Sequence, residues 1–479
     1  MNTYEPVIGL EVHVQLATKS KIFCACSTKF GSEPNANTCP ICMGLPGTLP
    51  VLNEQALRLA MKVGLALNTT IAKRIKFDRK NYFYPDLPKA YQISQYDMPV
   101  CAHGGLTIQP ESSGGITKQI GITRAHLEED AGKLLHEGVK DGSWVDYNRA
   151  GIPLLEIVSE PDIRSPEEAY DYLTRLKAVL LYLEVSDCNM EEGSLRCDAN
   201  VSLRPKGESQ FGTKVEIKNL NSFKAVQKAL QYEIERQTEA LEQGEKIAQE
   251  TRLWNDMQGK TISMRSKEHA HDYRYFPEPD LVPFTVTEKE IEAVRRALPE
   301  LPQARKERFV KNFGLSDYDA SVLVNDKVLG EYFENCVKEG ANAKLACNWI
   351  QTDLLGALNE RCLSFDQNPI TPKHLAGMLA LIENNTISGK IGKDVLPLMI
   401  DEKKTADQIV KEKNLVQVTD TKLLEDIAER VIAANPNPVE QYKSGKTQAI
   451  GFLVGQIMKE TKGKANPKIV NEILQKKLS

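Results

Sequence analysis

Strict alternation of apolar and polar residues marks the beginning of the chain. From residue 7 to residue 16, every second residue is aliphatic, and the residues between them include Glu11 and His13. A period of two is typical of a half-buried β-strand, so this segment predicts a strand with Glu11 and His13 on its polar face. That face is either exposed surface or part of a functional site, and the segment alone does not decide between them.

Two later segments predict a hairpin, and two others predict helices. Residues 193–203 and 214–218 alternate on either side of a turn-rich stretch, so they predict antiparallel strands with Asp198 on the polar face. Ser165 and Ser222 each precede a segment with apolar residues at helical spacing, which predicts two N-capped amphipathic helices.

Acidic residues end or interrupt two further apolar segments. Residues 120–130 predict a strand that ends in an acidic cluster containing Glu128 and Glu129. Residues 152–158 form an apolar run in which Glu156 is the only charged residue. Glu156 either faces water or is buried beside a cation, because burial of a lone carboxylate is costly. A solvated strand end is the alternative for the acidic cluster.

Composition limits the class of protein. A length of 479 residues suggests roughly three domains, and strand alternation gives way to helical periodicity beyond about residue 290. The 61 basic and 65 acidic residues nearly balance, so contacts with nucleic acid must be local. We see no signal peptide and no apolar run long enough for a membrane span, and we expect a cytoplasmic protein or an organellar one without its transit peptide.

Four of the ten cysteines are clustered at metal-ligand spacing. Two close pairs are joined by a loop rich in Gly, Asn and Pro, which suits tetrahedral coordination of zinc by four thiolates. Four thiolates close the coordination sphere, so the zinc would be structural. Two disulfides are the alternative. The predicted ligands are Cys24, Cys26, Cys39 and Cys42.

Basic and aromatic residues alternate along residues 77–97, where Arg79, Lys80 and Tyr82 stand close together. Arg274 lies in a second basic and aromatic stretch. Basic groups can hold phosphates while aromatic rings stack on bases, so these four residues are candidates for binding a nucleotide cofactor. An aromatic loop packed on the core explains the pattern equally well.

The C-terminal segment is locally basic. Residues 441–479 contain eight Lys and two Glu on predicted helices. Such a segment can bind a phosphate backbone, although basic solvated helices are common. The candidate lysines for this contact are Lys443, Lys446, Lys459, Lys462 and Lys464.

Carboxylates and one imidazole stand on several of the predicted polar faces. If these faces converge, the oxygens would hold a hard cation such as Mg²⁺ with waters left for substrate phosphates, and His13 would add a nitrogen ligand. The set consists of Glu11, His13, Glu128, Glu129, Glu156 and Asp198.

Long motifs are spread over nearly the whole chain and include IGLEVHVQL, FDRKNYFYPDLPKAYQISQYD, HLEEDAGK, DYNRAGIPLLEIVSEP, MEEGSLRCDANVSLRP and DYRYFPEPDLVP. These motifs resemble those of the B subunits (GatB) of tRNA-dependent aspartyl/glutamyl amidotransferases. The resemblance implies an α+β fold: a cradle domain with an antiparallel β-sheet and flanking helices over residues 1–293, an all-α helical domain over 294–403, and a YqeY-like, tRNA-binding helical tail over 404–479.

The resemblance also implies an activity. ATP would phosphorylate the side-chain carboxylate of Glu on glutamine tRNA or of Asp on asparagine tRNA, and ammonia would then displace the phosphate. Ammonia would come from glutamine hydrolysed by the A subunit (GatA), and the C subunit (GatC) would complete a heterotrimer. The alternatives are a zinc-containing tRNA-binding scaffold without catalytic activity and a self-sufficient ligase. The ligase is disfavoured because the sequence contains no glutaminase nucleophile motif.

Residue roles follow from the same motifs. The resemblance implies that His13, Glu129 and Glu156 are magnesium ligands and that Glu11 and Asp198 are further essential acidic residues of the same cavity. It also implies that the four clustered cysteines bind zinc. Which of the two mischarged tRNAs is the substrate does not follow from the sequence.

Overall fold

The structure, a computed structural model, describes residues 4–478 apart from 137–141, 265–272, 418–420 and 462–464. It divides into two compact units, residues 1–302 and residues 303–479, and each is described by itself. The first unit combines a large sheet with flanking helices and the second is helical, which confirms the predicted α+β class.

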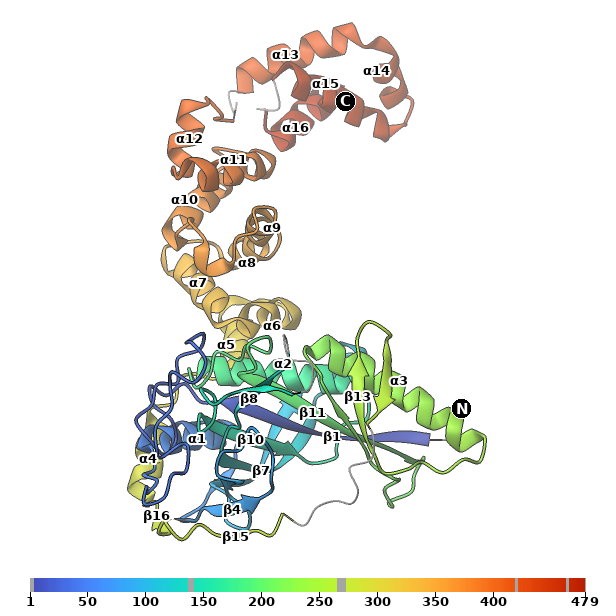
Figure 1. Ribbon diagram of the computed structural model, residues 1–479. Helices are drawn as coiled ribbons and strands as arrows, with labels where there is room; N and C mark the ends of the chain where they lie inside the picture. The colour runs from blue at the N-terminus through green and yellow to red at the C-terminus, as the bar shows by residue number, and fades with distance from the viewer. Residues whose placement is uncertain (1–3, 137–141, 265–272, 418–420, 462–464, 479) are drawn as a thin grey trace. The chain divides into compact units, whose positions relative to one another are not determined.

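A mixed sheet forms the centre of the first unit (Figure 1). Its strand order is β14-β13-β12-β11-β1-β10-β7-β6-β2, and neighbouring strands are antiparallel except for the parallel pair β12 and β13. All the strands predicted from alternation are present in it. The bounds are β1 (Tyr4–Gln15), β2 (Thr70–Ile71), β6 (Cys101–Ile108), β7 (Lys118–Glu129), β10 (Pro153–Ser159), β11 (Leu195–Pro205), β12 (Val215–Lys218), β13 (Thr251–Asn255) and β14 (Lys260–Ser263).

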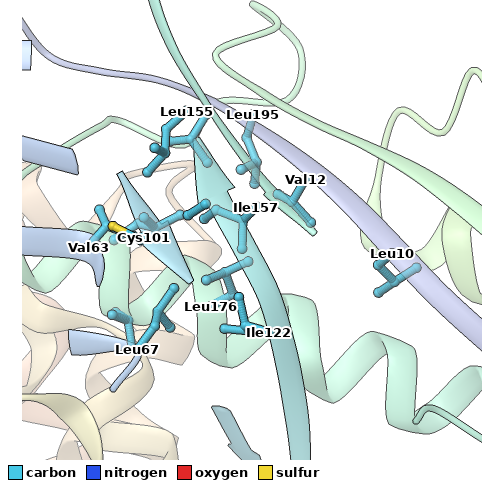
Figure 2. Close-up of a cluster of buried hydrophobic side chains, with 14 of the residues drawn as sticks. Leu10, Val12, Val63, Leu67, Cys101, Ile122, Leu155, Ile157, Leu176 and Leu195 are labelled. Carbon is cyan, nitrogen blue, oxygen red and sulfur yellow. The ribbon is translucent and has the colours of Figure 1, made fainter. Parts of the chain in front are cut away.

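Helices α1 (Glu54–Ala66), α2 (Pro166–Tyr182) and α3 (Phe223–Glu242) cover the apolar face of this sheet. Ser165 and Ser222 cap α2 and α3, as predicted, because each side chain accepts a hydrogen bond from a backbone N–H of the first turn. Figure 2 shows aliphatic side chains from the strands and helices in one buried cluster. Burial of this face leaves the opposite face of β1, β10, β7 and β11 to carry the polar residues.

A β-bulge changes which residues of β7 point to which face. Val158 of β10 pairs with Arg124, but the next residue, Ser159, pairs with Ile122, so Thr123 is the extra residue of the bulge. Before the bulge the even-numbered residues of β7 face the core, and after it the odd-numbered ones do. The hydroxyl of Ser159 accepts the backbone N–H of Leu10 at 2.9 Å, which satisfies a buried donor at this irregular position.

Residues 77–97, for which an aromatic loop packed on the core was one alternative, contribute two strands to a small sheet. Its order is β15-β4-β5, with β4 (Asp78–Asn81), β5 (Tyr91–Ser94) and β15 (Phe276–Pro277). Both prolines of this stretch lie in the loop between β4 and β5. β5 lies beside the end of β7, since Ser94 bonds to Glu128 and the amide of Ile93 bonds to Glu129.

Two shorter pairings and one helix complete the first unit. They are β16 (Phe284–Thr285) with β3 (Arg74–Ile75), β8 (Lys133–Leu135) with β9 (Trp144–Asp146), and α4 (Glu288–Arg296). Ile291 and Val294 of α4 belong to the same apolar core as α1.

The second unit has two separate apolar cores. One includes residues from Phe309 to Val410, and the other includes residues from Leu424 to Leu478. The predicted domain boundaries after residues 293 and 403 stay predictions, and Ala406, Ile409 and Val410, beyond the second of them, still belong to the first of these cores. None of the described helices is long and apolar enough to cross a membrane. The helices are α5 (Pro302–Phe313), α6 (Asp317–Asn325), α7 (Lys327–Lys338), α8 (Ala343–Asn348), α9 (Leu355–Asn359), α10 (Pro372–Glu383), α11 (Gly389–Glu402), α12 (Ala406–Glu412), α13 (Thr421–Ala434), α14 (Pro436–Lys443), α15 (Ile450–Glu460) and α16 (Pro467–Leu478).

Candidate functional site

The polar face of the sheet brings together residues from four strands. In the strand register, Glu156 of β10 stands between His13 of β1 and His126 of β7, and His13 also pairs with Arg196 of β11. Directly opposed residues on antiparallel strands have neighbouring side chains, so this row forms one continuous polar strip. The convergence expected of His13 and Glu156 is therefore present.

Glu128 completes a compact cluster with these residues. His13 Nε2 lies 3.4 Å from Glu156 Oε2 and 3.8 Å from Glu128 Oε1. His126 Nε2 lies 3.4 Å from Glu156 Oε2 and 3.7 Å from Glu128 Oε2. Glu156 is 9% exposed and Glu128 3%, so both carboxylates are buried and the solvent-facing alternative for Glu156 is wrong.

The charges of this cluster oppose the effect of burial. Burial alone would lower the pKa of His13, but the hydrogen bond and charge of Glu156 raise the pKa overall. Burial would raise the pKa of Glu156, but the hydrogen bond to His13 and the charge of His126 lower it well below its usual range. Burial would likewise raise the pKa of Glu128, but the hydrogen bond to His126 and the charge of His126 lower it overall. Both carboxylates are therefore ionised at neutral pH and can act as oxygen ligands.

The donor set suits a hard divalent cation. The ligand atoms of His13, Glu128 and Glu156 all lie within 4.8 Å of one another. In an octahedral Mg²⁺ site with ligand distances of about 2.1 Å, ligand atoms are about 3 Å apart when adjacent and about 4.2 Å apart when opposite. The separations of 3.4 and 3.8 Å from His13 lie between these two values, so each ligand atom would need to move by less than about 1 Å to reach magnesium geometry.

Glu11 and Asp198 lie one step along the same face. They are directly paired in the register of β1 and β11. Asn200 Nδ2 donates to Glu11 Oε1 at 2.9 Å, and Lys218 Nζ lies 2.7 Å from Asp198 Oδ2. The two carboxylates thus extend the polar strip beyond His13.

Glu129 points away from this cluster. Its carboxylate lies 2.5 Å from Lys89 Nζ and accepts the backbone N–H of Ile93 at 3.0 Å. Glu128 and Glu129 are successive residues of a strand and therefore face opposite sides. Glu129 as a magnesium ligand stays a prediction, and Glu128 occupies the position beside His13 and Glu156.

A buried carboxylate at the end of β7 holds Arg196 in this strip. Asp130 is 4% exposed, and its Oδ1 accepts Arg196 Nη2 at 2.9 Å while its Oδ2 accepts Gln15 Nε2 at 2.7 Å. The arginine side chain itself is 32% exposed. Asp130 therefore holds a positive charge next to His13.

The candidate nucleotide-binding residues divide into two groups. Lys80 Nζ lies 4.9 Å from the centre of the Tyr273 ring, and the charges of Glu128 and Glu156 outweigh burial to raise the pKa of Lys80. Tyr82 packs edge-on against Tyr273. Lys80 and Tyr82 thus lie at the border of the cluster.

Arg79 and Arg274 have other surroundings. Arg79 binds the buried carboxylate of Glu278 through two nitrogens, at 2.7 and 2.8 Å, and also contacts Asp280. Arg274 has a positive φ of 45°, and its carbonyl accepts Asn81 Nδ2. Arg79 is thus already paired, and a role for either arginine in nucleotide binding stays a prediction.

The four clustered cysteines converge as predicted. The sulfur atoms of Cys24, Cys26, Cys39 and Cys42 all lie within 4.8 Å of one another. The hydrogen bond from Cys24 lowers the pKa of Cys42 to about 4, and the charge of Lys21 acts in the same direction. Four thiol sulfurs at these separations fit a tetrahedral zinc site, in which they would be about 3.8 Å apart.

The sequence matches one family over most of its length. The GatB/GatE catalytic domain matches residues 6–292, and the GatB domain matches residues 331–478. The chain belongs to the GatB family. Curated B subunits of aspartyl/glutamyl-tRNA(Asn/Gln) amidotransferases are similar throughout: that of Caldanaerobacter subterraneus is 59% identical over 99% of both chains, and that of Carboxydothermus hydrogenoformans is 58% identical over the full length of both. The catalytic-domain match contains the whole polar strip and the cysteine cluster.

In this GatB-family chain, the lysines proposed to bind tRNA belong to the second unit. Lys443, Lys446 and Lys459 are exposed, on or beside α14 and α15. Lys462 and Lys464 lie outside the described residues. The exposed lysines leave their charges available to a polyanion, and the contact itself stays a prediction.

Sequence reasoning missed His126, and it included Glu128 in the candidate set while the resemblance implied Glu129 as the magnesium ligand. A signal for both was present, because the apolar residues of 120–127 change from even to odd positions along the strand. Such a change of parity is typical of a β-bulge, and it places His126 and Glu128 on the polar face. Lys21, which is buried beside Cys42, gave no recognisable signal.

Proposed function

We propose that this chain is the subunit that carries out the ATP-dependent phosphorylation and amidation of Glu-tRNA(Gln), Asp-tRNA(Asn) or both. The cluster of His13, Glu128 and Glu156 on the sheet carries this proposal. A carboxylate is a poor electrophile, so its amidation requires an activated acyl group. Phosphoryl transfer needs positioning and charge stabilisation more than it needs a protein nucleophile, and the site has the required oxygens and cations.

The reaction has two steps. The side-chain carboxylate of the aminoacyl-tRNA attacks the γ-phosphorus of ATP, which gives an acyl phosphate and ADP. Ammonia then attacks the acyl carbon, phosphate leaves, and the product is the amide. Magnesium, when bound, would neutralise the phosphate oxygens during the first step.

The residues of the site have distinct proposed roles. His13, Glu128 and Glu156 would hold magnesium, and the resemblance adds Glu129 as a candidate ligand if its bond to Lys89 is released. Lys80 would contact phosphate oxygens. Glu11 and Asp198 would orient the reacting groups from the neighbouring row of the sheet.

Further components complete the proposal. The A subunit would supply ammonia from glutamine, the C subunit would join the A and B subunits, and zinc in the cysteine cluster would be structural. The exposed lysines of the second unit support tRNA binding there. All of these would act in the cytoplasm.

The decisive experiment uses the chain purified with its A and C subunits. Glu156→Gln removes a buried ligand charge and should abolish tRNA-dependent phosphate release from ATP while glutaminase activity remains. Glu192→Gln, at an exposed position before β11, is the matched control and should behave as the wild type. Unchanged amide formation in Glu156→Gln would refute the catalytic role and favour the scaffold alternative.

A further inference from the structure

Lys21 is an unusual residue in this fold because its side chain is completely buried. Its Nζ lies 3.7 Å from Cys42 Sγ and 3.2 Å from the carbonyl oxygen of Tyr147. A buried ammonium is costly unless acceptors surround it, and here the acceptors come from the cysteine cluster and from the turn that precedes β10. The ammonium of Lys21 therefore joins the cysteine cluster to this turn.

Cys42 is the thiolate that most needs such a partner. It is the cysteine of the four with a buried side chain, at 6% exposure. Four thiolates and one Zn²⁺ carry a net charge of −2, which is unfavourable in a partly buried site. The backbone N–H of Cys39 donates to Cys42 Sγ at 3.2 Å, and the ammonium of Lys21, 3.7 Å from the same sulfur, adds a positive charge.

The loop that carries the cysteines is also joined to the turn before β10 by hydrogen bonds. Asn35 donates to Asp146 Oδ1 at 2.9 Å and accepts the backbone N–H of Tyr147 at 2.8 Å. Asn148 accepts the backbone N–H of Asn37 at 2.7 Å and donates to the carbonyl of Glu33 at 2.7 Å. This turn leads directly into the strand that carries Glu156.

A second contact links the same loop to the end of β7. A Cβ atom at Gly44 would lie 2.3 Å from Cγ of Lys89, so Gly44, two residues after Cys42, packs directly against this lysine. Lys89 in turn binds Glu129. The loop that carries the cysteines therefore contacts segments next to both β7 and β10, the strands that supply Glu128 and Glu156 to the cluster with His13.

We propose that Lys21 is a positioning residue that stabilises zinc at Cys42 and, through Tyr147, fixes the cysteine loop against the turn that orients β10. Its positive charge lowers the free-energy cost of burying the negatively charged thiolate cluster. Its hydrogen bond to the Tyr147 carbonyl holds the turn that precedes β10, the strand that carries Glu156. The effect on the site rests on the proposed function, whereas the effect on zinc does not.

The test uses the full-length chain purified with its partner subunits and measures zinc release to the chelator 4-(2-pyridylazo)resorcinol. Replacement of a residue that supports metal ligands typically costs about 10–100-fold in metal affinity. We expect Lys21→Met to release zinc faster by a factor in that range. Lys21→Arg, which keeps the charge, should stay near the wild type. Lys19→Met, at an exposed position two residues away, is the control and should have no effect.

Lys21→Gln keeps a donor for Tyr147 but removes the charge, and it replaces Lys21→Met if that variant does not fold. Zinc retention equal to the wild type in the neutral variants, or equally fast release from Lys21→Arg, would overturn the charge role. Tenfold or greater loss of tRNA-dependent phosphate release in Lys21→Met supports the link to β10. Rapid zinc loss with wild-type phosphate release would overturn that link alone and leave the proposed function intact.

Discussion

His13 Nε2 and Glu156 Oε2 lie 3.4 Å apart across the antiparallel strands β1 and β10, at positions that are directly paired in the register. Strand pairing alone sets this proximity, because opposed residues have Cβ atoms about 5 Å apart. The same register places His126 on the other side of Glu156. The central carboxylate is thus flanked by two imidazoles, and its position depends on two separate strand pairings.

Glu128 and Glu129 should differ in their effects on magnesium. We expect Glu128→Gln to raise the Mg²⁺ concentration for half-maximal phosphate release by roughly tenfold or more, because it removes a ligand oxygen beside His13. Glu129→Gln should leave this concentration within about threefold of the wild type, because Glu129 contacts Lys89 instead. Magnesium titrations of the two variants measure the difference. The reverse order would show that the two side chains exchange roles when magnesium binds.

The adjacent residues Arg79 and Lys80 should also have different roles, since they point to opposite faces of β4. Lys80→Met should weaken ATP binding, because it removes the ammonium proposed to contact the phosphate oxygens, whose pKa the charges of Glu128 and Glu156 raise. Lys80→Arg keeps a positive charge and should restore part of the affinity for ATP. Nucleotide titration at fixed Mg²⁺ measures the effect. Wild-type affinity in Lys80→Met would exclude a phosphate contact.

Arg79→Met should instead lower stability. The side chain of Glu278 is fully buried, and removal of one partner of a buried ion pair costs about 3–5 kcal/mol. Thermal unfolding followed by circular dichroism should show a lower midpoint for this variant, with nucleotide affinity retained in the folded protein. Weaker nucleotide binding without loss of stability would support the role in nucleotide binding expected from the sequence.

Ser159 should matter for the stability of the sheet. Ser159→Ala leaves the buried backbone N–H of Leu10 without its acceptor, which costs about 1–3 kcal/mol. We expect a lower unfolding midpoint and faster amide exchange in β1. Ser209→Ala, at an exposed position after β11, serves as the control. Equal amide exchange in both variants would argue against a role for this hydrogen bond at the bulge.

The exposed lysines of the second unit should contribute to tRNA binding through charge. Replacement of Lys443, Lys446 and Lys459 by Ala should weaken tRNA binding at low salt and reduce the slope of log affinity against log salt by about 0.7–0.9 for each phosphate that is no longer neutralised. Binding measured from 50 to 200 mM salt gives this slope. Lys373→Ala with Lys390→Ala, also exposed in this unit, is the control. An unchanged slope would place the tRNA-binding surface elsewhere.

Local patterns in the sequence determined most of the elements and part of the site. Alternation predicted β1, β11 and β12, and Ser165 and Ser222 marked the starts of α2 and α3. The spacing of the cysteines predicted their convergence, because ligands close in sequence need little from the rest of the fold. Glu11 and His13 followed from alternation as well, since the face of a side chain is a local property of a strand.

Only the tertiary structure decided which residues meet across strands. The change of parity over residues 120–127 signals the bulge that turns His126 and Glu128 to the polar face, but their place beside Glu156 depends on the pairing of β7 with β10. Lys21 meets Cys42 and Tyr147 only because distant segments fold onto each other. Register and buried charge pairs are set by hydrogen bonds and packing between segments far apart in the chain, and local residue patterns carry little information about such partners.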